Sequence, residues 1–230
     1  ASIQENPIKN YTWPAMEEGT EITLTAKATR KESDKTPYTV NYYLENANND
    51  KYTLYKTQTL EGTTNEAITK EKVDIKLENC TIAQTDITAN TVIKADGTTT
   101  VNVYYARNKY TVTLQRKENI SKVKLSTVQG ETVENGTETS IQKQIKWGAI
   151  LKIESTIENM PGYTYNYNGW KIVNIAGEEI EQNLGTEYDS TKESTKIEVP
   201  TANIILTTSA TKVANTYTII YNANTGTGNM

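Results

Sequence analysis

The stretch Tyr38-Thr39-Val40 opens a strand-like segment, and the same pattern returns as Tyr110-Thr111-Val112 and as Tyr217-Thr218-Ile219. An aromatic residue, a threonine and a β-branched residue fit the pleated, half-buried surface of a sheet. Successive openings are 72 and 107 residues apart. Both distances exceed the roughly 20 to 50 residues of a solenoid repeat, so the sequence predicts separate modules in tandem.

A second repeated sequence pattern marks where modules end. Residues 22–30 and 204–212 both alternate in polarity, and each ends in Ala-Thr followed by a basic residue. We therefore expect strands that close one module shortly before the next one opens. The predicted organisation is the tail of a preceding repeat plus a linker over 1–35, a first complete module over 36–108, a second module over 109–213, and the start of a further repeat over 214–230.

The first module has the element order of a β-grasp (ubiquitin-like) fold. Alternating residues around a polar turn predict a hairpin, a Glu-Gly break precedes a short helix, and an Asp-Gly turn precedes the closing strand. The expected elements are strands at 38–44 and 52–60, a helix at 64–71, one or two strands within 82–92, and a strand at 99–105. The fold class predicted for the chain is mainly β with a short helix (α+β), built from tandem β-grasp-like modules.

Turn signals divide the second module into shorter strands. Turn-forming residues, chiefly Gly, Pro and Asn, mark the positions 134–137, 160–162, 168–169 and 176–177. Between these turns we expect strands at 110–115, 139–145, 150–157, 170–175 and 197–208.

Composition excludes the commoner catalytic and metal sites. The chain has no His, so a Ser-His-Asp triad cannot form, and the single cysteine, Cys80, lacks the base that would activate it. No CxxC motif, Cys/His cluster or DxDxDG calcium loop is present. We therefore expect no enzyme activity, no cofactor and no metal. Cys80 is expected to be a small, half-buried side chain on or beside a strand.

Charge and hydropathy bear on the partners. With a formal net charge of −4 and a pI of about 5.2, the chain lacks the excess of basic residues that binds phosphate groups, so nucleic acid is not expected as a partner. No apolar run is long enough to cross a bilayer. The 15 Tyr and the absence of Phe indicate small cores, because tyrosine buries its ring while keeping its hydroxyl in water. We expect the chain to be monomeric.

Two acidic pairs, Glu17-Glu18 and Glu178-Glu179, could supply the carboxylates of a glycosidase. Adjacent residues on a strand point to opposite faces, so neither pair can flank one glycosidic bond by itself. Solvated charge in turns is the interpretation that we favour.

An aromatic strip is the best candidate binding site. Tyr163, Tyr165 and Tyr167 alternate along one stretch, and Trp170 follows them. Alternation would place the three tyrosines on one face of a strand, where they could stack on a sugar ring or grip a protein hot spot. The alternative, which we favour, is that Trp170 and one tyrosine belong to the core of the module.

These segments resemble known bacterial surface repeats. Residues 217–228, 162–170, 16–26 and 199–207 are similar to the opening strand, the central Gly-Tyr-Thr and Gly-Trp pair, and the closing segment of the internalin-type B-repeat, also called the Listeria–Bacteroides repeat. Residues 40–44 and 101–105 resemble related mucin-binding-protein repeats of Gram-positive bacteria. The chain departs from the B-repeat by an insertion around 120–140 and by its lack of Phe.

The resemblance implies a location at the bacterial surface. It suggests a non-catalytic repeat region that is extracellular, at the cell surface or cell wall, and acts as a stalk or spacer with a role in adhesion. The alternative is a carbohydrate- or host-protein-binding module that uses the aromatic strip, with a host glycan or a surface or matrix protein as partner. Some surface repeats also carry a Lys–Asn isopeptide bond, which requires a buried Lys beside an acid. An accessory domain of an enzyme is the third option.

Overall fold

The computed structural model describes residues 17–19, 35–128, 131–136 and 139–220. The chain divides into two compact units. The first unit comprises Ala1–Leu44, Thr53–Lys76 and Ile82–Tyr105, and the second comprises Glu45–Tyr52, Leu77–Thr81 and Ala106–Met230. Most of the tail and linker predicted over 1–35, and the last ten residues of the repeat predicted over 214–230, lie outside the described residues.

A single mixed sheet forms the first unit. Its strands lie side by side in the order β2-β1-β4-β3, and β1 runs parallel to β4 at the centre, with Val40 opposite Val101 and Tyr42 opposite Val103. The elements of this unit, in chain order, are β1 (Lys35–Glu45), β2 (Tyr52–Thr63), α1 (Lys70–Val73), β3 (Cys80–Thr85) and β4 (Thr100–Arg107).

Alternation along the two central strands separates a buried face from an outer face. Every second side chain is buried from Thr36 to Tyr42 in β1 and from Val101 to Tyr105 in β4, whereas the residues between them are half-buried or exposed. The segment around α1 adds further apolar side chains to the core. The buried apolar residues of this unit are Tyr38, Val40, Tyr42, Ile68, Val73, Ile93, Val101, Val103 and Tyr105. On the other face, the rings of Tyr43 and Tyr104 stack with centroids 4.8 Å apart.

The helix predicted at 64–71 is replaced by one turn at Lys70–Val73. The residues before it pair with a neighbouring segment instead: the Ile68 N–H donates to Thr91 O at 3.0 Å, and the Ile93 N–H donates to Glu66 O at 3.0 Å. Asn65 also has a positive φ of 66°, which a helix does not allow. A pairing distant in the sequence therefore overrides the local helical preference.

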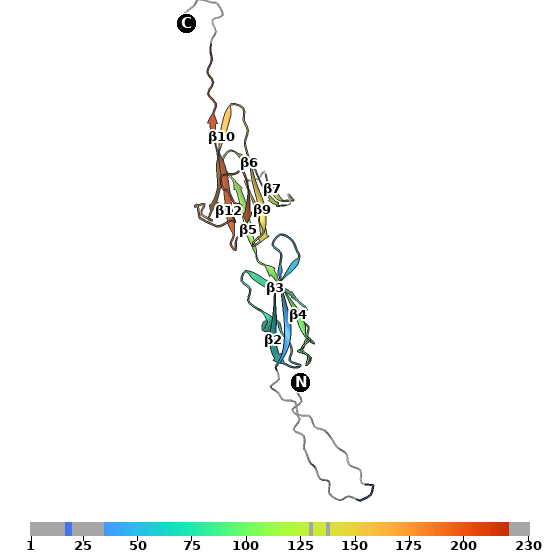
Figure 1. Ribbon diagram of the computed structural model, residues 1–230. Coiled ribbons are helices and arrows are strands. Elements are labelled where there is room, and N and C mark those ends of the chain that lie inside the picture. Colours follow the sequence, from blue (N-terminus) through green and yellow to red (C-terminus); the bar gives the residue numbers. More distant parts are fainter. Residues whose placement is uncertain (1–16, 20–34, 129–130, 137–138, 221–230) are drawn as a thin grey trace, which may run out of the picture. The chain divides into compact units, whose positions relative to one another are not determined.

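The second unit is a two-layer sandwich. One sheet has the order β10-β12-β5-β8 and the other β11-β9-β6-β7. Figure 1 shows the strands of this unit, among which β12 pairs with β10 on one side and with β5 on the other. Here too the first and last strands, β5 and β12, are parallel neighbours, with Leu114 opposite Leu206. The strands are β5 (Lys109–Arg116), β6 (Ile120–Thr127), β7 (Thr132–Gly136), β8 (Ser140–Lys146), β9 (Ile150–Ile157), β10 (Tyr163–Val173), β11 (Ser194–Glu198) and β12 (Ile204–Ala214).

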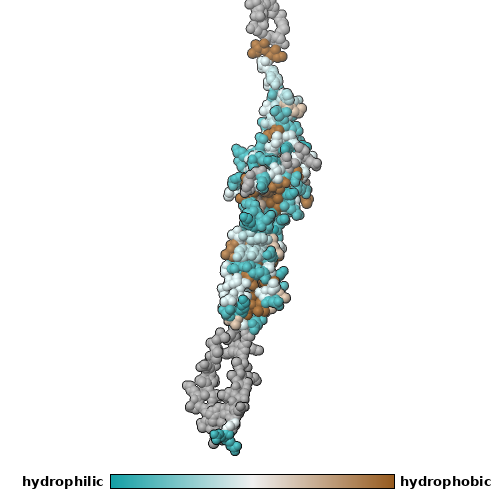
Figure 2. All heavy atoms as spheres, turned by 90° about the vertical axis from the view of Figure 1, so that its right-hand side faces the viewer, coloured by the Kyte–Doolittle hydropathy of each residue, from teal (hydrophilic) through white to brown (hydrophobic). Residues whose placement is uncertain are grey.

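One hydrophobic core joins the two layers of this sandwich. Leu114 and Leu206 from one sheet share a cluster with Leu125, Ile153 and Ile197 from the other, and each is at most 1% exposed. On the outside, the surface is mostly hydrophilic or intermediate in hydropathy, with hydrophobic residues in small groups (Figure 2). The described residues include no helix that is long and apolar enough to span a bilayer.

Three differences separate these strands from the sequence-based expectation. The insertion around 120–140 contains β6 and β7, which were not expected. The strand expected at 170–175 begins seven residues earlier, because Asn168-Gly169 forms an irregularity within β10 and not a turn. The strand expected at 197–208 is two strands in different sheets, since Pro200 interrupts the run between β11 and β12.

Loops from the first half of the sequence complete the second unit. Lys146 Nζ lies 2.6 Å from Glu45 Oε1, and both side chains are nearly buried. The indole N–H of Trp147 donates to Asn79 O at 2.9 Å, and the Arg107 guanidinium stacks 4.0 Å from the centroid of the Trp147 ring. All of these residues group with the second unit. The prediction of a mainly β chain with a short helix is confirmed by these three sheets and the single turn of α1.

A buried tyrosine anchors the segment after α1. The hydroxyl of Tyr105 donates to Asp74 Oδ1 at 2.7 Å and accepts from the Ile75 N–H at 3.0 Å. Lys76 Nζ lies 2.6 Å from Asp74 Oδ2. The hydrogen bonds from Lys76 and then Tyr105 hold the pKa of the Asp74 carboxyl at about 2.

The Asp74 carboxylate predicts an acid-sensitive part of the stability. A carboxyl group whose pKa is lower in the folded than in the unfolded chain stabilises the fold above its unfolded pKa, about 3.9, and this contribution is lost as the pH falls through about 2. Urea unfolding of the whole chain between pH 6 and pH 2 should therefore show a decline that Asp74→Asn reduces. The exposed Glu61→Gln variant serves as the control. Equal slopes for Asp74→Asn and the wild type would contradict this role.

Candidate functional site

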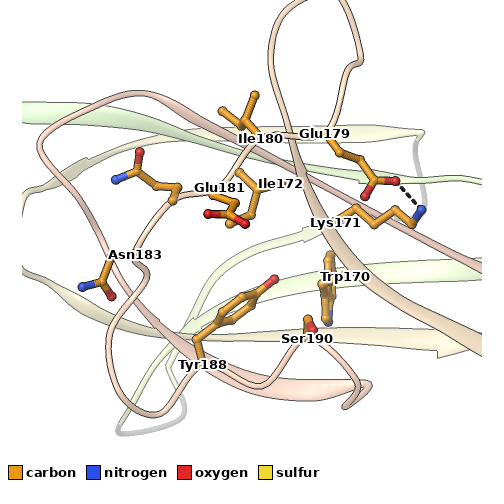
Figure 3. A pocket seen from close by; sticks show the side chains of 10 residues that line it. Trp170, Lys171, Ile172, Glu179, Ile180, Glu181, Asn183, Tyr188 and Ser190 are labelled. Atoms are coloured by element: carbon orange, nitrogen blue, oxygen red, sulfur yellow. Dashed lines mark hydrogen bonds and ion pairs between the residues drawn. The ribbon is translucent and has the colours of Figure 1, made fainter.

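A pocket of about 550 Å³ lies on the second unit between β10 and the long connection that follows it. This connection, residues 174–193, joins β10 to β11. Figure 3 shows Trp170, Lys171 and Ile172 entering from β10, and Glu181, Asn183 and Tyr188 from the connection. We call it the loop pocket, and its lining residues are Trp170, Lys171, Ile172, Glu179, Ile180, Glu181, Gln182, Asn183, Tyr188 and Ser190.

Backbone hydrogen bonds fix the connection against the strands. The Ile180 N–H donates to Ile172 O at 2.9 Å, and the Trp170 N–H donates to Ser190 O at 2.8 Å. Leu184, 2% exposed, inserts into the core from the middle of the connection. Irregular connections longer than about 12 to 15 residues are uncommon in compact domains and are often functional. The walls of the loop pocket are therefore ordered parts of the fold.

Gly169 allows the close approach of this connection to β10. Its φ of +86° is a conformation that favours glycine, and a Cβ at this position would lie 2.7 Å from Ser190 O. That distance is too short for any side chain without displacing the backbone of the connection. The Asn-Gly pair that predicted a turn in the sequence is instead the point where β10 accommodates the wall of the pocket.

Tyr188 supplies a hydroxyl group to the loop pocket. Its ring packs against the core of the second unit, and its hydroxyl points toward the middle of the pocket (Figure 3). Among the described residues this hydroxyl has no hydrogen-bond partner. Burial, and to a lesser extent Tyr167 and Asp189, raises the pKa of Tyr188 to about 12. The group is therefore a neutral O–H donor at physiological pH.

Carboxylates and amides line the opposite wall. Lys171 pairs with Glu179, which occupies both side chains. Asn183 Oδ1 accepts from the Gly185 N–H at 2.9 Å, and this bond orients its amide. Within the described part of the chain, the carboxylate of Glu181 has no ion-pair or hydrogen-bond partner.

The four residues of the predicted aromatic strip occupy different environments. Tyr163 is 40% exposed, and Lys212 Nζ lies 3.9 Å from its ring centroid. Tyr165 and Tyr167 are half-buried and pack against the core, and Trp170 is 3% exposed within it. The four side chains therefore do not share one open face. The role of this strip in binding stays a prediction.

Two of these aromatic residues differ in how their polar atoms are satisfied. The Tyr167 hydroxyl accepts from Thr208 Oγ1 at 2.9 Å and from Ser155 Oγ at 3.2 Å. Burial raises the pKa of this hydroxyl, and the two hydrogen bonds partly offset the effect. The indole Nε1 of Trp170 and the hydroxyl of Tyr165 are both buried without a partner in the described structure. Trp170 links the predicted strip to the loop pocket.

Sequence reasoning did not identify Tyr188, Glu181 or Asn183 as site residues. The one feature of the sequence that could have drawn attention to them is the length and acidity of the connection, whose 20 residues include six acidic residues and one basic residue. In the acidic pair at 178–179, Glu178 bonds to Asn174 and Glu179 pairs with Lys171, and both acids are exposed. Among the described residues, no group of three or more Cys, Asp or Glu side chains is arranged to hold a metal ion.

Cys80 lies where the sequence predicted it. It is the first residue of β3 and is half-buried. Burial raises the pKa of its thiol.

Comparisons with known proteins reveal only remote structural likeness. No family model matches the sequence, and no curated protein matches it. Among solved structures, the Bacillus anthracis TIE protein aligns with 78% of this chain at 9% identity and a TM-score of 0.32, and the chain spans 51% of its length. The type 2 repeat of the mucus binding protein MUB from Lactobacillus reuteri aligns at 10% identity, with 78% and 100% coverage and a TM-score of 0.24. The shaft pilin SpaA from Lactobacillus rhamnosus GG aligns at 9% identity, with 76% and 98% coverage and a TM-score of 0.17.

Truncation separates the two possible roles of the aromatic strip. Trp170→Ala should lower the free energy of unfolding by about 3 to 5 kcal/mol, because it empties a large buried volume. Tyr163→Ala should lower it by less than about 1 kcal/mol, since that ring is exposed. Denaturant titration measures both. A Trp170→Ala variant as stable as the wild type would contradict the core position of this side chain.

Proposed function

We propose that this chain is a non-catalytic tandem repeat region of a bacterial cell-surface protein that acts as a stalk and carries tension between its ends. The observation that carries the proposal is shared by both units. In each, the strand that opens the unit is the parallel neighbour of the strand that closes it. The repeated Tyr-Thr openings and the resemblance to surface repeats support the extracellular location.

Parallel pairing places the hydrogen bonds of the ladder in shear under load. In the first unit, Thr39 to Leu44 of β1 lie opposite Thr100 to Tyr105 of β4. Tension that pulls β1 toward its N-terminus and β4 toward its C-terminus acts along the strands in opposite directions. The slanted hydrogen bonds of a parallel pair must then break together and cannot open one at a time.

The second unit repeats the arrangement with different strands. β5 opens it and β12 closes it, and Val112 to Arg116 lie opposite Ile204 to Thr208. Both strands are central in their sheet, with β8 and β10 outside them. Because the paired strands are also buried against the second sheet, shearing them would expose core side chains to water.

A polar row crosses the outer face of the first sheet and reinforces its central pair. Thr57 Oγ1 donates to Asn41 Oδ1 at 2.9 Å, and Asn41 Nδ2 donates to Asn102 Oδ1 at 3.1 Å. Asn102 Nδ2 donates in turn to Asp86 Oδ2 at 2.9 Å. The row therefore ties β2, β1 and β4 to the segment after β3 by side-chain bonds perpendicular to the strands.

The proposal also includes several predictions made from the sequence. The first unit, with its hairpin, short helix and central parallel pair, is a β-grasp-like module, and the chain is a monomer. Tyr217 and Ile219 are exposed and lie outside the described strands, and we infer that they belong to the opening of a further module, because their sequence counterparts Tyr38 and Val40 are buried in β1. A role in adhesion, with a host glycan or matrix protein as partner, is the second part of the proposal.

Single-molecule pulling through the two ends of the chain tests the stalk. Two cooperative unfolding events are expected, with contour increments equal to the extended lengths of about 250 and 360 Å less the folded end-to-end length of each module, because the predicted modules of 73 and 105 residues extend by roughly 3.4 Å per residue. Modules that carry load in shear should each resist until one abrupt event.

A pair of substitutions provides an internal control for this experiment. Asn41→Ala with Asn102→Ala removes the side-chain link between β1 and β4. The force of the shorter event should fall, and the force of the longer event should be unchanged. Gradual extension without discrete events, or an equal effect on both events, would contradict the proposal.

A further inference from the structure

The two strands of the parallel pair in the first unit carry the same sequence pattern. Thr39-Val40-Asn41 in β1 and Thr100-Val101-Asn102 in β4 are identical, and a tyrosine follows two positions later in each, Tyr43 and Tyr104. The register places these like residues directly opposite one another, so that threonine faces threonine, asparagine faces asparagine and tyrosine faces tyrosine. The first unit therefore contains a parallel, in-register pair of matching segments.

The outer face of this pair forms two side-chain ladders. Asn41 Nδ2 donates to Asn102 Oδ1 at 3.1 Å. The rings of Tyr43 and Tyr104 stack with centroids 4.8 Å apart and 15° between their planes. Asparagine ladders and stacked aromatic rings are the contacts that in-register strands make in cross-β assemblies, where strands repeat every 4.7 to 4.8 Å or so. The pair of β1 and β4 is thus one step of such a stack, held inside a folded unit.

Both strands also have the composition of segments that stack with copies of themselves. The segments 38–44 and 98–106 contain no charged residue, no Pro and no Gly, although 23% of the chain is charged. Most of their residues are Thr, Val or Tyr, which favour strands. Short segments with high β-propensity and low net charge are the ones that form cross-β stacks when they are exposed. We call these two stretches the matching segments.

The parallel pair of the second unit lacks this match. Opposite residues there include Thr113 with Ile205 and Arg116 with Thr208. β5 also carries Lys109 and Arg116, whose charges would repel one another if copies of this strand stacked in register. Parallel pairing by itself therefore does not require matching strands, and the match in the first unit needs a separate explanation.

The folded unit keeps the matching segments away from other copies of the chain. β1 and β4 lie at the centre of the sheet, with β2 and β3 at its edges, so both backbone edges of each central strand are already paired. Only the opening of the unit frees them. If the unit opens in one cooperative event, that event frees both segments of a copy together, and each copy then offers two strands that can extend the same stack.

We propose that, once the first unit opens, the matching segments pair in parallel register with the same segments of other copies of this chain and join the copies through cross-β stacks. The trigger rests on the proposed function, because tension along the stalk shears β1 from β4. The pairing itself does not, since any cause that opens the unit exposes the same segments. Failure of the pulling experiment would remove the trigger, whereas failure of the assembly experiment below would remove the pairing.

Assembly of the whole chain in solution tests the pairing without applied force. Val73→Ala opens the first unit more often, because Val73 is 1% exposed in its core and lies outside both matching segments. This variant should form sedimenting assemblies that bind thioflavin T and give a fibre reflection at about 4.7 Å. The wild type, whose segments stay paired within the unit, should remain monomeric over the same period.

Two added charges separate pairing from loss of stability. In the Val73→Ala chain, Asn102→Asp places a carboxylate at every step of the stack and should lower the amount of assembly roughly tenfold. Asn102 donates to Asp86 Oδ2, so this change destabilises the folded unit further, and a loss of stability alone would increase assembly. Thr59→Asp adds the same charge at an exposed position of β2 outside both segments and should leave assembly unchanged.

Spin labels report the register of the strands. In a Val73→Ala chain that also carries Cys80→Ser, a label is attached at Thr100→Cys in one sample and at Thr59→Cys in another; both positions are exposed. In-register stacking brings copies of position 100 to about 4.8 Å from one another, so the spectrum of the assemblies should merge into one exchange-narrowed line. The label at position 59 should keep its three lines.

Any of four results would overturn the proposal. These are no assembly by the Val73→Ala chain, equal assembly by the wild type, equal assembly of the Asn102→Asp and Thr59→Asp variants, or three separate lines from the label at position 100. Assemblies that form only when the unit opens, that Asn102→Asp prevents and that merge the lines at position 100 would establish the pairing.

Discussion

The parallel pairing of the first and last strand is the interaction on which each unit depends. It brings together residues about 60 positions apart in the first unit and about 90 apart in the second. Such pairing has a large entropic cost of loop closure, which the burial of the paired strands must offset. In both units the strands that meet this cost, β1 with β4 and β5 with β12, also present the alternating side chains of the core.

The constraint explains several details that otherwise look unrelated. Because the ends of each unit are held by one ladder, the connections between other strands are free to lengthen. The 20 residues at 174–193 use this freedom to form a wall of the loop pocket, and Gly169 provides the close approach that such a wall needs. A rigid frame with a variable connection is the usual way in which binding groups are held in place.

Much of the strand pattern could be predicted from the sequence, because alternation and turn residues are local signals. The limits of β5, β8 and β9 follow from them within one residue. What could not be predicted depends on partners that are distant in the sequence. The helix expected at 64–71 does not form because these residues pair with residues 91–93. Asn168-Gly169 does not form a turn because the backbone of Ser190 packs closely against Gly169. The loop pocket shares this cause. Trp170 could be singled out as part of an aromatic pattern in the sequence. Tyr188 and Glu181 could not, because they approach Trp170 only when the connection folds back on β10.

If the parallel pair of β5 and β12 holds the second unit together, removal of β12 should unfold that unit. A chain that ends at Ala202 keeps β5 to β11 but lacks β12, and its backbone amide signals can be compared with those of the whole chain. We expect the signals of the second unit to collapse to those of an unfolded chain, while Val40 and Val103 of the first unit keep their native shifts. Native shifts for β5, β6 and β9 in the shortened chain would contradict it.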